Sequence, residues 1–138
     1  MTTAREIMSA GADCVQTTDT VGDAARMMTR LQVGALPICG SDDKLKGVLT
    51  DRDIVTKVLG QGRDTNQYTA GDLTQDEAVT IGADDSSEEV LATMTRHRVR
   101  RLPVIDDGRL VGMVALADVG RSLSNPQVGD LVDALSAE

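Results

Sequence analysis

Aromatic side chains are almost missing from this sequence. It has no phenylalanine and no tryptophan, and Tyr68 is its single tyrosine. The core must therefore be built from valine, leucine, isoleucine, methionine and alanine. Proteins that bind single-stranded nucleic acid stack the bases on aromatic rings. The lack of such rings excludes a platform of that kind.

Sequence features typical of membrane or secreted proteins are also scarce. No apolar run approaches the roughly 20 residues that a membrane-spanning helix needs. Arg5 and Glu6 stand near the N-terminus, where a secretory signal would have an apolar segment. Two cysteines in 138 residues do not make a disulfide-rich scaffold. We therefore expect a cytoplasmic protein with no membrane partner.

Positive charge is in deficit. The chain has 14 lysines and arginines against 22 aspartates and glutamates, a formal net charge of −8. A protein that binds duplex nucleic acid neutralises phosphates with a basic face. The charge balance argues against nucleic acid as a partner, while a local basic patch can still hold a small anion.

The chain contains an internal repeat. A shift of 66 residues places positions 33–38 (VGALPI) on 99–104 (VRRLPV), and 28–30 (MTR) on 94–96 (MTR). One residue is lost at a polar turn, and a shift of 65 then places 45–49 (LKGVL) on 110–114 (LVGMV). A register kept through two blocks, with its only gap at a turn, indicates a duplication.

Each repeat predicts the same order of elements, β-α-β-β-α, and therefore an α+β fold. We expect the first repeat at 1–60, a linker at 61–69, the second repeat at 70–124 and a tail at 125–138, where Leu131, Val132 and Leu135 can form a short helix. Aspartate, threonine and serine are good helix N-caps, and two apolar runs joined by a short polar turn predict an antiparallel hairpin. The expected elements are short helices at 4–8 and 70–73, strands near 14–16 and 79–81, helices opened by Asp19-Thr20 and Asp85-Ser86, hairpins of 36–39 with 45–49 and of 102–105 with 110–115, and closing helices from Asp51 and Leu116.

The end of the first hairpin suits a nucleotide. Gly47 permits a close backbone approach, and Thr50 stands where a strand becomes a helix, a position that favours phosphate. Asp53 can accept hydrogen bonds from both hydroxyls of a ribose. The same Thr-x-x-Asp spacing also predicts a capping box, in which the two side chains satisfy the first helical turn. From spacing alone the capping box is the favoured interpretation.

The duplicated unit, its Leu-Pro-hydrophobic strand and its Gly-hydrophobic-hydrophobic-Thr-x-x-Asp ending resemble a tandem CBS-domain pair (Bateman module). The resemblance extends from Ala4 to about Ser122. It implies two sheets packed against each other with pseudo-twofold symmetry. It also implies two clefts that bind adenosine ligands such as AMP, ADP, ATP or S-adenosylmethionine.

The resemblance assigns candidate ligand-binding residues. Thr50 corresponds to a phosphate-side hydroxyl and Asp53 to a ribose ligand, with Pro37 and Ile38 on the adjoining strand. Asp118 corresponds to the ribose ligand of the second site. There the sequence departs from the family, because Ala115 replaces the expected threonine or serine. The missing hydroxyl weakens the second site for a phosphorylated ligand and also argues against a capping box at Asp118.

A dense cationic cluster precedes the second hairpin. Arg98, Arg100 and Arg101 flank a Leu-Pro pair, and guanidinium groups match phosphate bidentately. Arg100 or Arg101 can therefore hold a nucleotide phosphate; the alternative is a solvated strand end paired with carboxylates. His97 lies beside the cluster and lacks an obvious catalytic partner, so we expect a helix-end residue.

The two cysteines have no counterparts in the second repeat, where Thr80 and Ile105 replace Cys14 and Cys39. Three interpretations stay open because the two strands that carry them should be neighbours. They are two free thiols, a disulfide or redox switch, and half of a metal site with His97 as a third ligand. Free thiols are the usual state in the cytosol, and structural zinc takes four ligands, so we expect no metal.

No nucleophile–base pair or metal cluster marks an enzyme. We expect a non-enzymatic regulatory module that binds an adenosine nucleotide, requires no cofactor, and acts on a separate effector protein. The alternative is a ligand-free interaction or stress protein that acts through its surface, with Cys14 and Cys39 as a redox link. Because helix faces stay exposed in such units, we also expect a homodimer.

Overall fold

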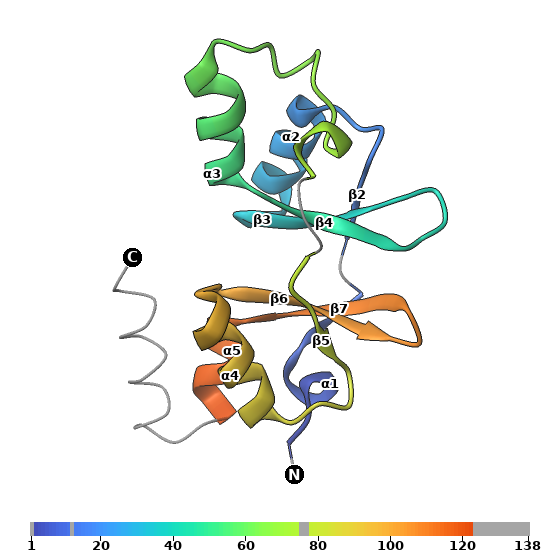
Figure 1. The fold of residues 1–138 in the computed structure, drawn as a ribbon, viewed down its shortest axis with the longest axis vertical. Helices are drawn as coiled ribbons and strands as arrows, with labels where there is room; N and C mark the ends of the chain where they lie inside the picture. The colour runs from blue at the N-terminus through green and yellow to red at the C-terminus, as the bar shows by residue number, and fades with distance from the viewer. Residues whose placement is uncertain (1, 12, 75–77, 123–138) are drawn as a thin grey trace. The chain divides into compact units, whose positions relative to one another are not determined.

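A computed structural model describes residues 2–11, 13–74 and 78–122. The chain divides into two compact units. We call Asp13–Ala78 the first-repeat unit, and Met1–Ala12 together with Val79–Glu138 the second-repeat unit. Figure 1 labels α1–α5 and β2–β7. The predicted tail, 125–138, lies outside the described residues.

The first-repeat unit has a three-stranded sheet in the order β2-β3-β4. β2 runs parallel to β3, and β3 pairs antiparallel with β4 in a register that sets Ala35 opposite Thr50. Its strands are β2 (Val15–Gln16), β3 (Ala35–Cys39) and β4 (Leu45–Thr50), and its helices are α2 (Val21–Leu31), α3 (Asp51–Asp53), the π-helix η1 (Ile54–Val58) and the 3-10 helices η2 (Leu59–Gln61) and η3 (Gly71–Leu73).

The second-repeat unit repeats this plan with one additional strand. Its sheet has the order β1-β7-β6-β5, and Arg101 lies opposite Ala115 between β6 and β7. Its elements are α1 (Ala4–Ile7), β1 (Ser9–Ala10), β5 (Ile81–Gly82), α4 (Ser87–His97), β6 (Arg101–Asp106), β7 (Arg109–Ala115) and α5 (Leu116–Ser122). The α+β class and the β-α-β-β-α order of both repeats are confirmed.

The amphipathic helix α2 shows how local sequence builds each unit. Thr20 caps the helix with its hydroxyl, which accepts from the Asp23 amide at 3.0 Å, while the Asp23 carboxylate accepts from the Thr20 amide at 3.3 Å. The buried positions 21, 24 and 28 then recur at helical spacing. The helix ends at Gln32, which adopts a left-handed conformation with φ 57°.

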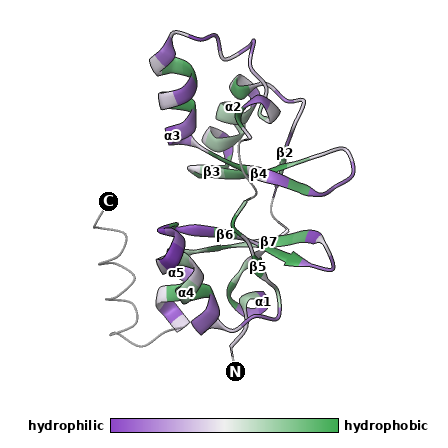
Figure 2. Ribbon diagram, in the orientation of Figure 1, coloured by the Kyte–Doolittle hydropathy of each residue, from purple (hydrophilic) through white to green (hydrophobic). Residues whose placement is uncertain are grey.

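Each unit has its own aliphatic core. Figure 2 shows hydrophobic and hydrophilic residues on the same helices, as expected for helices with one buried face. Within the described residues, no helix is long and apolar enough to cross a membrane. The fully buried large side chains of the two units include Val15, Val21, Ile38, Leu49 and Val58 in the first and Val90, Met94, Leu102, Val104, Val114 and Val119 in the second.

The leading helical segments of the two repeats are exchanged. α1 precedes the first repeat but packs in the second-repeat unit, where the Ala4 amide donates to the Asp85 carbonyl at 2.8 Å. Arg5 pairs there with Asp106 at 2.8 Å, and this carboxylate raises the pKa of the Arg5 guanidinium. Reciprocally, the Ala70 amide donates to the Asp19 carbonyl at 2.8 Å in the first-repeat unit. Each compact unit therefore combines the body of one repeat with the leading segment of the other.

β1 lies so close to β7 that only glycine fits between them. A Cβ atom on Gly112 would lie 2.6 Å from both the Ser9 carbonyl oxygen and the Met8 sulfur. We expect Gly112→Ala to lower the free energy of unfolding by about 1–3 kcal/mol, because the backbone of β1 must move away. Urea unfolding followed by circular dichroism measures the change.

The first repeat supplies the matched control. Gly47 is the counterpart of Gly112, and its Cβ would meet the mobile methyl group of Thr74 at 3.1 Å. Gly47→Ala should therefore be milder than Gly112→Ala. Equal stability of Gly112→Ala and the parent would contradict the close approach of β1 to β7.

Candidate functional site

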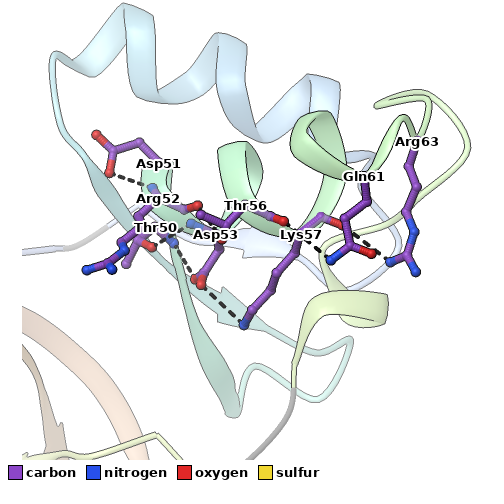
Figure 3. A network of polar contacts seen from close by, with 8 residues as sticks. All are labelled: Thr50, Asp51, Arg52, Asp53, Thr56, Lys57, Gln61 and Arg63. Atoms are coloured by element: carbon purple, nitrogen blue, oxygen red, sulfur yellow. Dashed lines mark hydrogen bonds and ion pairs between the residues drawn. The ribbon is translucent and has the colours of Figure 1, made fainter.

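The corner where β4 becomes α3 forms a complete capping box. The Thr50 hydroxyl accepts from the Asp53 amide at 3.1 Å, and the Asp53 carboxylate Oδ2 accepts from the Thr50 amide at 3.0 Å (Figure 3). The capping interpretation of the Thr-x-x-Asp spacing is confirmed. The same two hydrogen bonds fix the rotamers of both side chains, so this corner has a defined geometry.

The second oxygen of Asp53 faces a lysine. Lys57 Nζ lies 3.2 Å from Asp53 Oδ1, and the side chains are 32% and 24% exposed, respectively. Figure 3 shows the lysine reaching back from η1 to the carboxylate. Each carboxylate oxygen has two lone-pair directions and is engaged once by the residues that the structure describes. The partly exposed carboxylate therefore keeps one acceptor direction on each oxygen, as a pair of vicinal hydroxyls requires.

The expected strand residues lie next to this corner. Pro37 and Ile38 are buried in β3, opposite Val48 and Gly47 of β4. Gly47 does permit a close approach, and the group that approaches it is Thr74 of the same unit. The structure thus brings Thr50, Asp53 and the two β3 residues into one hairpin.

The equivalent corner of the second-repeat unit lacks the hydroxyl but retains the carboxylate contact. Asp118 Oδ2 accepts from the Ala115 amide at 2.9 Å, and Arg121 pairs with Asp118 Oδ1. The full capping box is absent from this corner, as expected from Ala115, and only its carboxylate half is present. A carboxylate three residues along accepts the backbone amide whether or not a hydroxyl completes the box.

The arginine cluster adjoins that second corner. Arg101 is opposite Ala115 in the β6–β7 ladder, and the Arg100 carbonyl accepts from the Leu116 amide at 2.8 Å. Arg98, Arg100 and Arg101 are exposed, and none forms an ion pair with another described residue. His97 is the exposed last residue of α4, as expected of a helix-end histidine.

Cys14 and Cys39 form a disulfide. Their Cα atoms are 5.7 Å apart, and the bond joins the residue before β2 to the end of β3. The expected adjacency of the two strands is confirmed, and the disulfide is selected from the three interpretations. In the described part of the chain, no three histidine, cysteine or carboxylate side chains gather as metal ligands.

A groove in the first-repeat unit was missed by the sequence reasoning. It lies between α2 and the α3–η1 segment and has a volume of about 350 Å³. Val55, which lines the groove, is 55% exposed, and Leu59 at the start of η2 is 56% exposed. The sequence did contain a signal for this groove. Two exposed apolar residues stand one helical turn apart, on a different face from the buried Ile54 and Val58. The lining includes Met28, Gln32, Val33, Asp51, Ile54 and Val55.

Comparison with known proteins gives concordant results. The CBS domain family matches residues 4–60 and 70–125. Hypoxic response protein 1 of Mycobacterium tuberculosis is 49% identical over 135 residues, which are 98% of this chain and 94% of that protein. The crystal structure of hypoxic response protein I with two coordinated zinc ions has a TM-score of 0.83 and 50% identity, covering 89% of this chain and 100% of that chain. The crystal structure of CBSX2 in complex with AMP shares the fold, with a TM-score of 0.75 and 24% identity over 88% of this chain and 96% of that chain.

Proposed function

The chain belongs to the CBS domain family, and from that premise we propose that it is a non-catalytic regulatory module that binds an adenosine nucleotide. The observation that carries the proposal is the Thr50–Asp53 corner, with its fixed hydroxyl and its partly exposed carboxylate. Asp53 accepts the ribose hydroxyls and Thr50 donates to the phosphate side. The fold is compatible with such a ligand, because CBSX2 is solved in complex with AMP.

In the second repeat the phosphate-binding group is on the opposite strand. Thr50 lies opposite Ala35 in the first hairpin, whereas Ala115 lies opposite Arg101 in the second. The hydroxyl is lost from β7, and a guanidinium is gained on β6 at the paired position. Arg101 then contacts the phosphate and Asp118 the ribose, so the second repeat keeps a binding site of different chemistry.

The module acts as a homodimer that reports the energy or stress state to a separate effector protein. It resides in the cytoplasm and needs no cofactor for this role. The alternative is a ligand-free interaction protein linked to redox state through Cys14 and Cys39. Absence of nucleotide binding in the experiment below would favour that alternative.

The oxidised Cys14–Cys39 pair does not fit zinc. A relative is solved with two coordinated zinc ions, and zinc takes cysteine as the thiolate. Cys14 and Cys39 are joined to each other and supply no thiolate. No step of the proposed function therefore passes through a metal.

The test is calorimetric titration of AMP, ADP, ATP and S-adenosylmethionine against the parent and Asp53→Asn. Asparagine can still accept the Thr50 amide, so the helix cap survives while the carboxylate is lost. We expect about a tenfold loss of affinity at the first-repeat site, since a hydrogen bond to a charged acceptor exceeds one to a neutral acceptor by about 1 kcal/mol or more.

The matched control is the capping box that begins α2 in the same unit. Asp23 makes the same two contacts with Thr20, and the Arg26 guanidinium and Thr20 lower its pKa. Asp23→Asn should leave nucleotide affinity unchanged. Equal losses from both variants would indicate a general effect on the unit, and unchanged binding by Asp53→Asn would exclude Asp53 as the ribose ligand.

A further inference from the structure

The lysine beside the proposed ribose ligand belongs to an unusually sheltered ion pair. Lys57 Nζ lies 3.2 Å from Asp53 Oδ1, and the two side chains are 32% and 24% exposed. Among the ion pairs of the described residues, this is the only one in which both side chains are less than one-third exposed. Solvent screens a partly buried charge less than an exposed charge. The ammonium group of Lys57 therefore acts strongly on a ligand that binds at Asp53.

The chain that follows Asp53 fixes the backbone that carries Lys57. This residue lies in the π-helix η1, and its carbonyl accepts from Arg63 Nη1 at 3.3 Å (Figure 3). The Arg63 guanidinium lies over the Tyr68 ring, and Tyr68 packs against the core of the first-repeat unit. Short π-helical segments are frequent at functional sites. The fold therefore holds the backbone of Lys57 at a fixed place beside the Asp53 carboxylate.

The formal charges around this corner cancel only because Lys57 is present. Asp51 and Arg52 are both exposed and have opposite charges, and Asp51 points away from Asp53 and lines the groove (Figure 3). Asp53 and Lys57 form the second neutral pair. Without Lys57 the corner would carry a net negative charge, located on the carboxylate that faces the ligand. That charge would repel a phosphate and attract a cationic ligand.

We propose that Lys57 makes the first-repeat site select phosphorylated adenosine ligands over S-adenosylmethionine. The inference rests on the proposed function and names the ligand class of that site. AMP, ADP and ATP are anions, whereas S-adenosylmethionine carries a sulfonium and an ammonium group against a single carboxylate. When the ribose hydroxyls bind Asp53, these charged groups lie within about one Debye length of Lys57, ~8 Å at physiological ionic strength. The lysine attracts the phosphorylated ligands and repels S-adenosylmethionine, and it has little effect on uncharged adenosine.

Calorimetric titration of AMP, adenosine and S-adenosylmethionine tests the selection. The Asp118→Asn background weakens the second-repeat site, and asparagine can still accept from the Ala115 amide there. We expect Lys57→Gln to lower AMP affinity about tenfold, to leave adenosine affinity within about twofold, and to raise S-adenosylmethionine affinity severalfold. Lys57→Arg should restore the preference of the parent, because arginine retains the charge.

A lysine at the other end of β4 is the matched control. Lys46 Nζ lies 3.1 Å from Asp42 Oδ2, also four residues apart, and Lys46 is separated from Thr50 by about 13 Å of strand, more than one Debye length. Lys46→Gln removes the same charge from the chain and should change none of the three affinities. Equal effects of Lys46→Gln and Lys57→Gln would overturn the proposal, because net charge alone would then explain them.

Salt provides a readout that a purely structural role of Lys57 would not change. The ratio of AMP affinity to adenosine affinity should fall steeply with sodium chloride in the parent and much less in Lys57→Gln. Equal losses of AMP and adenosine in Lys57→Gln would overturn the selection by charge. The proposed function would still stand in that case, provided that Asp53→Asn lowers both affinities. Binding of no ligand, or binding that Asp53→Asn does not affect, would overturn the selection together with the first-repeat site.

Discussion

Loss of the Cys14–Cys39 disulfide should lower the free energy of unfolding of the first-repeat unit by about 3–4 kcal/mol. The reason is that the unfolded chain gains conformational entropy when the disulfide no longer closes a loop in it. The bond spans a sequence separation of 25 residues, all within that unit. The best replacement is taken from the second repeat, where Thr80 and Ile105 hold the same positions. Cys14→Thr with Cys39→Ile therefore removes the cross-link and fills the buried site with the residues that the sister unit uses.

The chain provides its own probe for this effect. Tyr68 is the single aromatic residue, and it packs against the core of the first-repeat unit with Arg63 over its ring at 5.2 Å. Tyrosine fluorescence therefore reports the unfolding of that unit, while circular dichroism follows both. We expect the urea midpoint by fluorescence to fall in the double variant and in the parent treated with dithiothreitol.

The second-repeat unit, which has no cysteine, is the internal control for the disulfide. When the two units unfold in separate transitions, removal of the disulfide should leave the urea midpoint of the second-repeat unit unchanged. Intact mass should rise by about 2 Da on reduction, for the two hydrogens gained by the thiols. An unchanged mass, or a fluorescence midpoint that dithiothreitol does not move, would contradict a stabilising disulfide. Because thiols in the cytosol are usually kept reduced, the same measurement on freshly lysed cells tells which form the cell holds.

Local signals in the sequence predicted the elements of both repeats well. The caps at Thr20 and Ser86 begin α2 and α4, and the polar turns join the hairpins as expected. These features depend on neighbours in sequence, so a short pattern contains the necessary information. The helix cap at Asp53 was also predicted from its spacing to Thr50. Nucleotide binding at the same carboxylate does not follow from spacing, and it stays a proposal.

The exchange of leading segments could not be predicted from such patterns. Ala4 and Ala70 are both fully buried, and the two repeat cores against which they pack arose from one duplicated sequence. Apart from the ion pair of Arg5 with Asp106, the two segments use the same kind of buried alanine anchor, so a short sequence pattern does not show which unit each segment packs in. The groove beside Val55 was missed for a related reason. Periodicity indicates which side chains are buried, and it does not show where two helices leave a space.

The second repeat offers the other large expected effect. Arg101→Ala should lower the affinity of the second-repeat site for ATP by roughly 10- to 150-fold, the equivalent of about 1.5–3 kcal/mol for charge-assisted hydrogen bonds. Affinity for adenosine, which has no phosphate, should not change. The prediction follows from the ladder, in which Arg101 is opposite Ala115 and Ala35 is opposite Thr50.

The same ladder supplies the rescue and the control. Adding Ala115→Thr to Arg101→Ala recreates the hydroxyl and the small residue of the first repeat, so part of the ATP affinity should return. Arg109→Ala removes an exposed arginine at the other end of the same hairpin and should have no effect. Calorimetry in the Asp53→Asn background, where the first site should bind about tenfold more weakly, separates the two sites. Equal losses for ATP and adenosine would show that Arg101 supports the fold of the site and does not bind the phosphate. A rescue by Ala115→Thr would show that the phosphate can take its donor from either strand of the hairpin.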